Sequence, residues 1–443
     1  MPIPLGANRP WAWNFFQICI FLLTIGCAYQ ARRRVWLGLN EYRTPLLIWL
    51  GLIIITSFQM LALPASIVSV LSPNAYDIQS TLNASQYYLS LDPGQTEISF
   101  FKLLALFCLF FCVVSLVNSE FRIKALLSTM VACGTFQALY GAIEILFASK
   151  VSWVFALPVE NVATGSFVYK NHFANFLMMC LAAGIGLMVT SLQKDSMRSP
   201  RDWMRSIAST LLSNKALIRI SLAIMVIGLV MSRSRMGNAA FFIAMTLVGV
   251  LALLLIKNKS KGLSLLVVSM FIIDLFIVSA WFGLEQVQQR LAQTSLQQES
   301  RDEVVRDAVP MLFDYPLVGT GAGSFYSTFP AYKTNDVHMF YDHAHNDYLQ
   351  MAIEYGLIGF TLMLAMGVYA LYKSLRAMRT RRNSIFKGTG FACAMVIIGM
   401  GIHMTVDFPL QAFANACYFV TFIALATICN RLQLYRLKQA KHT

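Results

Sequence analysis

Residues 171–192 read NHFANFLMMCLAAGIGLMVTSL, a short polar start followed by an uninterrupted, uncharged apolar run. A helix of about 20 apolar residues crosses the hydrocarbon core of a bilayer, which is about 30 Å thick. Similar runs recur along all 443 residues, so that 57% of the chain is apolar, only 13% is charged and the mean hydropathy is +0.60. Soluble domains usually carry about 25% charged residues. The sequence therefore predicts an all-α, polytopic transmembrane helix bundle.

The apolar runs predict eleven membrane spans, or twelve if the first helix is split. The spans are predicted at residues 11–30, 45–64, 99–117, 124–148, 171–192, 216–232, 237–256, 262–283, 348–372, 388–406 and 411–430. Residues 1–283 then form an N-terminal transmembrane bundle and residues 284–347 a large outer loop with short helices. Residues 348–443 form the last three spans and a basic cytoplasmic tail.

The distribution of charge predicts how the chain is oriented in the membrane. The formal net charge is +14, but a nucleic-acid-binding protein would need this charge on one exposed face of a folded domain. Here most Lys and Arg residues lie in alternate short loops, which the positive-inside rule places in the cytoplasm. The amino terminus is therefore expected outside and the carboxyl terminus inside. Residues 1–13 lack the basic segment of a cleavable signal, so the first apolar run is expected to remain as a span.

Two features that could suggest other chemistry have simpler interpretations. All nine cysteines fall in apolar spans, which favours a packing role over disulfides or metal ligation. The Gly-x-Gly-x-Gly stretch at 319–323 resembles a nucleotide loop, but neither the preceding strand nor the following helix of a dinucleotide fingerprint is evident. The loop before it, from Glu285 to Arg306, reads as an amphipathic helix with Val304, Val305 and Ala308 on its apolar side.

Polar residues on the outer side of the membrane fall into four segments. These are Lys170–His172 at the start of the fifth span, Arg233–Arg235 between the sixth and seventh, Arg301 and Arg306 in the long loop, and Asp342–Asp347 before the ninth. Under the predicted topology all four segments lie at one membrane face. We expect the functional site there.

Arg233 and Arg235 depart from the positive-inside trend, because they lie in a tight outer turn. A guanidinium stays charged and can bind two phosphate oxygens through parallel hydrogen bonds. These arginines therefore predict an anion-binding site. Snorkelling of the side chains to lipid headgroups is the alternative.

His345 is the predicted general base. A neutral imidazole can accept the proton of an attacking hydroxyl, an effect of about a hundred- to ten-thousand-fold. If the helix has begun by His345, residues 345, 349, 352 and 356 share one stripe. Gly356 and Gly359 would then allow a neighbouring helix to approach closely. The alternative is a helix-capping stretch with structural histidines.

The acids of this region allow further interpretations. The stretch from Asp342 to Asp347 could bind a metal through His343 and His345 only if it is extended, because residues two apart on a helix point about 200° apart. Asp274 and Asp407 are isolated acids in or near the membrane, which makes them functional candidates. Asp407 is expected close enough to the outer surface to be solvated. Asp274 is expected to be a buried hydrogen-bond partner.

One group of motifs resembles a known family. His345-Asn346, nine residues, Gly356, two residues and Gly359 together resemble the signature of the O-antigen ligase and O-antigen polymerase superfamily. Further stretches follow in the family's order: Asn171-His172-Phe173, Ser234-Arg235, and Arg301-x-x-x-Val305-Arg306 leading to Pro316-Leu317-Val318-Gly319-x-Gly321. The resemblance covers about residues 160–365. Val305 stands where many members carry Trp.

The resemblance implies a metal-independent, inverting glycosyltransferase of the GT-C type that needs no cofactor. Its donor would be a glycan on undecaprenyl pyrophosphate, used at the periplasmic face of the bacterial inner membrane. His345 would be the general base, while Arg235 and Arg301 would bind the pyrophosphate and stabilise its developing charge. The remaining expected substrate contacts are Arg233, Arg306, Lys170, Asn171, His172, His343 and Asn346. Membrane lipids are expected partners and nucleic acid is not.

Several functions remain open. The acceptor could be a lipid A-core sugar (a ligase), another lipid-linked repeat (a polymerase) or a protein hydroxyl (an O-oligosaccharyltransferase). A polysaccharide transporter or flippase would need charged residues along a through-path, and paired repeats or matched broken helices that would favour one are not evident. In a structural membrane partner the motif residues would only cap helices. A pyrophosphate-linked polyprenyl donor explains best why permanent cations, a base and lipid-facing helices meet at one face.

Overall fold

The computed structural model describes residues 2, 5–31, 42–154, 156, 158, 161–192, 214–257, 262, 264, 265, 267–269, 271, 272, 301–335, 337 and 339–439. Within these ranges the chain is helical, with two isolated β-bridges and no β-strand. Nine helices in the same ranges are long and apolar enough to cross a membrane, and Ala216–Met231 is a shorter apolar helix. The predicted all-α, polytopic bundle is confirmed.

The transmembrane helices follow the predicted spans closely. They are α1 (Pro10–Ala31), α3 (Arg43–Met60), α6 (Pro93–Leu116), α7 (Glu120–Leu146), α8 (Lys170–Leu192), α10 (Asn214–Met231), α11 (Arg235–Leu255), α15 (Asp347–Thr380), α16 (Ser384–His403) and α17 (Phe413–Gln439). Every predicted span except the eighth coincides with one of them. Most of that span, 262–283, lies outside the described residues, as does Asp274.

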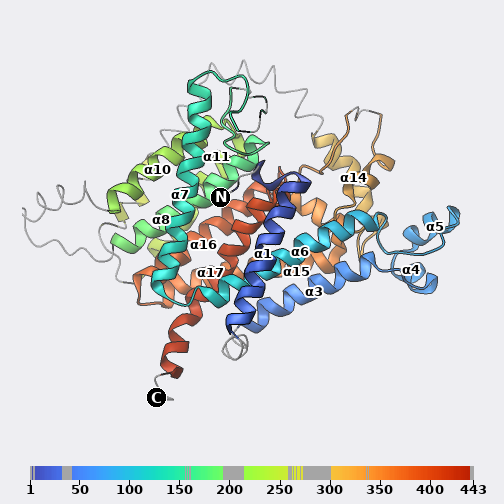
Figure 1. Cartoon of the computed structure of the whole chain (residues 1–443), viewed down its shortest axis with the longest axis horizontal. Coiled ribbons are helices and arrows are strands. Elements are labelled where there is room, and N and C mark those ends of the chain that lie inside the picture. The colour runs from blue at the N-terminus through green and yellow to red at the C-terminus, as the bar shows by residue number, and fades with distance from the viewer. Residues whose placement is uncertain are drawn as a thin grey trace, which may run out of the picture.

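Helix α8 is the most enclosed of the described spans. Helices α7, α10, α11, α16 and α17 all pack against it (Figure 1). Its closest partner is α16, because Gly186 and Gly388 bring the two backbones together. A Cβ added to Gly186 would lie only 2.6 Å from the carbonyl oxygen of Gly388. Small residues permit this approach between membrane helices, where no water drives association.

Helices α1, α3 and α6 form a second group beside α15 and α17 (Figure 1). Between α3 and α6 the chain forms two short helices, α4 (Ala65–Leu71) and α5 (Pro73–Thr81), which project at the edge of the molecule. Gln59, near the end of α3, connects this group to the long outer loop. Its amide donates to the carbonyl oxygens of Val318 and Glu354 at 2.6 and 2.8 Å.

The described part of the long loop has a small core of its own. It contains a helix at 301–314, then α14 (Phe325–Thr328) and a 3-10 turn, η3 (Phe329–Ala331). Val304 and Ala308 are fully buried, as the amphipathic pattern predicted, whereas Val305 is partly exposed. The helix continues past Arg306 to residue 314, further than expected. The expected stretch from 285 to 300 lies outside the described residues.

Candidate active site

Phe408, in the connection between α16 and α17, lies at the centre of the candidate site. Its ring contacts three imidazoles, with centroid separations of 4.4 Å to His343, 4.9 Å to His345 and 5.1 Å to His172. His172 belongs to the first turn of α8, and the other two precede α15. Two of the polar segments singled out in the sequence are therefore brought together by a phenylalanine that no motif indicated.

His345 lies outside the helix that was expected to carry it. Helix α15 begins at Asp347, and Asn346 caps it by accepting a hydrogen bond from the backbone N–H of Leu349 at 3.1 Å. His345 itself has φ 51°, a left-handed conformation that residues other than glycine rarely adopt. The expected helical stripe starting at His345 is wrong, because the capping turn separates the histidine from the helix.

The imidazole of His345 is held by ring contacts. It packs edge-on against Phe408 and against Tyr341, whose centroid is 5.7 Å away. Its Nδ1 is buried and has no hydrogen-bond partner among the described residues. Burial and the charge of Arg301 together lower the pKa of His345 from 6.5 to about 4, against the opposite effect of Asp407. The imidazole is therefore neutral at neutral pH and able to accept a proton.

His343 is held by a series of hydrogen bonds that the sequence analysis did not predict. Its Nδ1 lies 3.2 Å from Nε2 of Gln350, and the same amide donates to Oε1 of Glu354 at 2.9 Å. Burial and the neighbouring histidines lower the pKa of His343 from 6.5 to about 3. Gln350 and Glu354 are four residues apart on α15 and so share a face. That spacing is the one signal that could have identified them.

Hydrogen bonds of Asp347 connect the start of α15 to the segment that carries Phe408. Its buried carboxylate accepts hydrogen bonds from the N–H of Leu410 at 3.0 Å and from Nε2 of Gln411 at 3.4 Å. Its own N–H donates to the carbonyl oxygens of Met404 and Asp407 at 3.1 and 3.2 Å. The histidine-bearing segment is thus tied to the α16–α17 connection from both sides.

Asp407 is only 3% exposed, so the expectation that water solvates it is wrong. Hydrogen-bond donors of the protein take the place of water around its carboxylate. One carboxylate oxygen accepts a hydrogen bond from the N–H of Phe408 at 2.8 Å, and the other accepts one from the amide of Asn171. Nε2 of His403 lies 4.0 Å away. Asn171 therefore links the start of α8 to the same connection, while Asn415 donates to the carbonyl oxygen of His172 at 3.0 Å.

The arginine turn lies beside the start of α8. Ser234 caps α11 by accepting from the N–H of Gly237 at 3.2 Å, and Arg233 adopts φ 51° in the turn. Gly237 packs so closely that a Cβ there would lie 2.6 Å from Cβ of Ala174 in α8. Arg233 and Arg235 are both exposed. Two guanidinium groups therefore lie at the end of the bundle where the histidines lie.

The remaining basic residues differ in whether they make hydrogen bonds within the protein. Arg301 is exposed at the start of the described loop helix, and its charge contributes to the lowered pKa of His345. Arg306 instead stabilises the loop, because Nε donates to Oδ1 of Asp307 at 2.9 Å and Nη2 to Oγ1 of Thr334 at 3.0 Å. Lys170 is exposed at the first position of α8.

The two glycine motifs of the sequence pack directly on each other. Gly356 breaks α15 with φ 62° and ψ 179°, and the N–H of Leu357 donates to the carbonyl oxygen of Pro316 at 2.8 Å. A Cβ on Gly319 would lie 2.5 Å from the backbone N of Gly356. The expected close approach does occur at Gly356, but the partner is the loop at 316–319 rather than a neighbouring helix. This contact anchors the loop above α15.

The described residues contain no group of three or more His, Cys, Asp or Glu side chains placed to hold a metal ion. His343 and His345 do lie in a non-helical stretch, so the helical argument against a shared ion does not apply to them. Their rings instead pack against Phe408 in different orientations, at interplanar angles of 33° and 77°.

Comparison with known proteins gives one family match. Residues 220–364 match the family described as O-antigen ligase, which confirms the resemblance drawn from the motifs. The matched stretch contains Arg233, Arg235, Arg301, Arg306, His343, His345 and Asn346. Lys170, Asn171 and His172 precede it, and Phe408 and Asp407 follow it. No curated relative matches the chain.

Proposed function

Taking the O-antigen ligase domain at residues 220–364 as the premise, we propose that the chain is a glycosyltransferase using a glycan on undecaprenyl pyrophosphate. The glycan would be transferred to an acceptor hydroxyl, in the first instance on a lipid A-core sugar, at the periplasmic face of the inner membrane. A lipid-linked repeat or a protein hydroxyl is the alternative acceptor within the same chemistry.

The observation that carries this proposal is the partly buried imidazole of His345, whose Nδ1 is buried without a hydrogen-bond partner among the described residues and whose pKa the charge of Arg301 helps to lower. In the proposed step the neutral imidazole takes the proton of the acceptor hydroxyl. The acceptor oxygen forms a bond to the anomeric carbon as the bond from that carbon to the pyrophosphate oxygen breaks. The pyrophosphate leaves with the electron pair. A single displacement of this kind inverts the configuration at the anomeric carbon.

Arg301 and Arg235 are proposed to stabilise the negative charge that develops on the departing pyrophosphate. Guanidinium groups bind phosphate oxygens in pairs and remain charged throughout the reaction. Fixed positive charge aimed at a developing anion is often the largest single contribution to catalysis. In this proposal the arginines supply the charge that a metal ion supplies in other phosphate chemistry, so transfer is metal-independent.

The other residues predicted to contact substrate fall into exposed residues and residues that are bonded within the protein. Arg233 and Lys170 are exposed at the same end of the bundle and are proposed to contact the donor or its sugars. Four residues are proposed to form the wall around the base His345, because each makes a hydrogen bond or ring contact in the segments next to it. They are Asn171, His172, His343 and Asn346. Arg306 is proposed to position the loop through Asp307 and Thr334.

The proposed orientation agrees with the charges at the two ends of α15. His345 and Asn346 directly precede its first residue, and Arg379 lies in its last turn near Arg381 and Arg382. Basic residues concentrate on the cytoplasmic side of membrane proteins. The start of α15, the end of α16 and the starts of α8, α11 and α17 would therefore face the periplasm.

The experiment that tests this function combines transfer in vitro with a deletion strain. Purified protein in proteoliposomes containing EDTA should transfer a labelled glycan from undecaprenyl pyrophosphate to lipid A-core, and a deletion strain should lose all polymer from its lipopolysaccharide. A single capped repeat in the deletion strain would identify a polymerase instead. Absence of transfer to any of the three acceptors would contradict the glycosyltransferase proposal, and transfer lost only in EDTA would contradict metal independence.

A further inference from the structure

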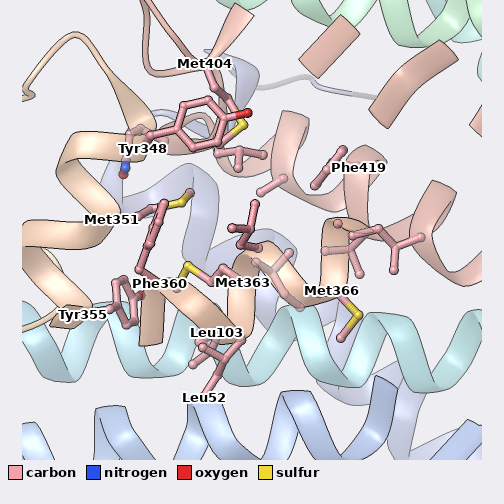
Figure 2. Close-up of a pocket in the computed structure, with 18 of the residues that line it drawn as sticks. Leu52, Leu103, Tyr348, Met351, Tyr355, Phe360, Met363, Met366, Met404 and Phe419 are labelled. Carbon is pink, nitrogen blue, oxygen red and sulfur yellow. The ribbon is translucent and has the colours of Figure 1, made fainter. Parts of the chain in front are cut away.

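Gln350, in the first turn of α15, has a buried polar side chain to which the proposed function assigns no role. It is only 2% exposed, and burying an amide is costly unless its polar atoms form hydrogen bonds. Figure 2 shows Tyr348 and Tyr355 of the same helix beside an apolar cavity, and Gln350 is not among the residues that line it. Residues two apart on a helix point about 200° apart, so Gln350 faces away from Tyr348. It faces the segment that carries the histidines.

Both ends of the Gln350 amide are hydrogen-bonded. Its Oε1 accepts from the backbone N–H of Ala344 at 3.2 Å. Its Nε2 donates to Oε1 of Glu354 at 2.9 Å and lies 3.2 Å from Nδ1 of His343. Because a backbone N–H can only donate, Oε1 must face Ala344, and the NH₂ group must face the other two partners. The partners therefore determine the orientation of the amide.

This orientation determines which nitrogen of His343 carries the hydrogen. An amide NH₂ group donates and does not accept, so Nδ1 of His343 must be the acceptor of the bond from Gln350. A neutral imidazole with an accepting Nδ1 carries its hydrogen on Nε2. The ring is neutral at neutral pH, because burial and the neighbouring histidines lower its pKa to about 3. Nε2 is neither bonded to a described residue nor one of the enclosed unpaired atoms, so an N–H donor faces the site.

The two histidines before α15 are therefore suited to different roles. Nδ1 of His345 has no hydrogen-bond partner among the described residues, and none of them fixes the tautomer of that ring. His343 presents an N–H at Nε2 and cannot accept a proton there. A neutral donor suits a neutral sugar oxygen, whereas a pyrophosphate is bound more strongly by the permanent charges of Arg235 and Arg301.

Glu354 holds the Gln350 amide in place. Its buried carboxylate accepts from Gln350 and also from the backbone N–H groups of Gly323 and Phe325 in the outer loop. Gln350 therefore connects the outer loop to Ala344, the residue directly before His345. Loss of the amide would release both the ring of His343 and the backbone next to the base.

We propose that Gln350 is a positioning residue that fixes His343 as a hydrogen-bond donor at Nε2, and that this N–H binds an oxygen of the acceptor sugar beside His345. The identity of the acceptor rests on the proposed function. Gln350 acts through His343 and does not itself touch the reacting atoms. The donor favours an acceptor with a second oxygen next to its attacking hydroxyl, as neighbouring hydroxyl groups of a sugar provide.

The first arm of the test observes the tautomer. Protein that contains isotopically labelled histidine is reconstituted in bilayers, and solid-state NMR distinguishes protonated from unprotonated ring nitrogens. The signals of His343 are identified by their loss in His343→Asn. They should show the hydrogen on Nε2 in the wild type. Gln350→Met keeps the length of the side chain but cannot donate, and it should add a population with the hydrogen on Nδ1. A wild-type hydrogen on Nδ1, or no change in Gln350→Met, would overturn the proposal.

The second arm compares two amide replacements of His343. Glutamine places an amide N–H near the position of Nε2, and asparagine places one near Nδ1. His343→Gln should keep KM for the acceptor close to the wild-type value. His343→Asn should raise it about tenfold, or about 1.4 kcal/mol, as expected for one lost hydrogen bond. In both variants kcat should change less than KM, because the bond also binds the acceptor before reaction. An equal rise in KM for both variants, or no rise in either, would contradict the proposal.

The third arm tests whether Gln350 acts through His343. Gln350→Met should raise KM for the acceptor in the wild-type background but not further in His343→Asn, because one bond cannot be lost twice. Gln137→Met is the matched control, since the buried amide of Gln137 bonds Ser166 through both ends, at 2.8 and 2.9 Å. The control should lower stability and leave both KM and the His343 tautomer unchanged. Additive effects of Gln350→Met and His343→Asn on KM would contradict a role through His343.

The failure of this proposal and the failure of the proposed function give different results. The tautomer of His343 can be observed in a protein that transfers no glycan, so the first arm tests Gln350 in either case. Absence of transfer by the wild-type protein would remove the proposed function and, with it, the acceptor contact. Wild-type transfer together with an unchanged KM in His343→Asn would keep the enzyme and remove the contact.

Discussion

The imidazole of His345 meets the ring of Phe408 edge-on, with 4.9 Å between centroids and 77° between the planes. The same phenylalanine contacts His343 and His172, so one ring from the α16–α17 connection positions side chains from two other parts of the chain. Edge-to-face packing is a preferred geometry for such rings. It orients the imidazole while leaving the buried Nδ1 without a hydrogen bond.

Replacing Phe408 by leucine should therefore slow transfer more than it destabilises the protein. Leucine retains apolar volume but cannot hold three imidazoles in place, and a misplacement of about 1 Å can cost about a hundredfold in rate. We expect kcat to fall about ten- to a hundredfold. Phe422→Leu, at a fully buried position of α17, is the control and should leave kcat per folded protein unchanged. Equal effects of the two variants would exclude a specific positioning role for Phe408.

Arg301→Ala and Arg235→Ala should each lower the rate of transfer about ten- to a thousandfold, because each removes charge from the proposed pyrophosphate site. Lysine at either position should restore part of the rate, since it keeps the charge but loses the planar fork. Arg122→Ala, an exposed arginine in the first turn of α7, should have no effect. The comparison requires rates normalised to the amount of folded protein in the membrane. A fully active alanine variant would remove that arginine from the phosphate role.

The rate of transfer should depend on pH in a way that reports the environment of His345. Burial lowers its pKa to about 4, so the neutral base should persist below pH 6.5 and be lost as the pH falls through about 4. Arg301→Gln removes a charge that lowers this pKa, and the acid limb of its pH–rate profile should move to higher pH. A wild-type limb near pH 6.5 would show that the imidazole is solvated.

The same shift has a consequence for stability. In the unfolded chain His345 takes up its proton near pH 6.5, whereas in the folded protein it does so near pH 4. The unfolded state therefore binds more protons in this window, and the free energy of unfolding should decrease as the pH falls from about 6.5 to about 4. Thermal unfolding of the wild-type protein and of His345→Ala across this range measures the effect, because His343, whose pKa is also lowered, contributes to both proteins.

Gly356→Ala should prevent normal folding of the outer loop. The φ and ψ of Gly356, 62° and 179°, fall in a region that is essentially restricted to glycine, and an added Cβ would collide with the carbonyl group of Leu317. The cost should exceed about 3 kcal/mol, lowering the melting temperature and the yield in the membrane. Gly26→Ala, where a Cβ meets no atom within 4 Å, should be tolerated. A stable, active Gly356→Ala protein would contradict the packing described for this glycine.

The transmembrane part of the fold was predictable because its determinants are local. A run of about 20 apolar residues forms a spanning helix whatever its neighbours are, since unsatisfied backbone groups are costly in lipid. The helix that follows His345 also existed as predicted. The predicted start of this helix at His345 was wrong. The cap by Asn346 and the left-handed backbone at His345 form a turn, and hydropathy carries no signal for such a turn.

The centre of the candidate site was not predictable for a different reason. Phe408 reads as one more apolar residue, and its contacts come from segments that are far away in the sequence. The burial of Asp407 likewise depends on Asn171, which reaches it from α8. Periodicity and motif spacing report neighbours along one helix, whereas these contacts exist only once several helices have packed. The roles assigned to the site residues stay predictions.

The central claim is that His345 accepts the proton of the acceptor hydroxyl, and the most direct measurement is glycan transfer by purified His345→Ala protein in proteoliposomes. Donor and acceptor are supplied at saturating concentration, and donor binding is measured in the same vesicles. The account predicts that the rate falls about a hundred- to ten-thousandfold while donor binding is retained. Transfer by His345→Ala at the wild-type rate would contradict it.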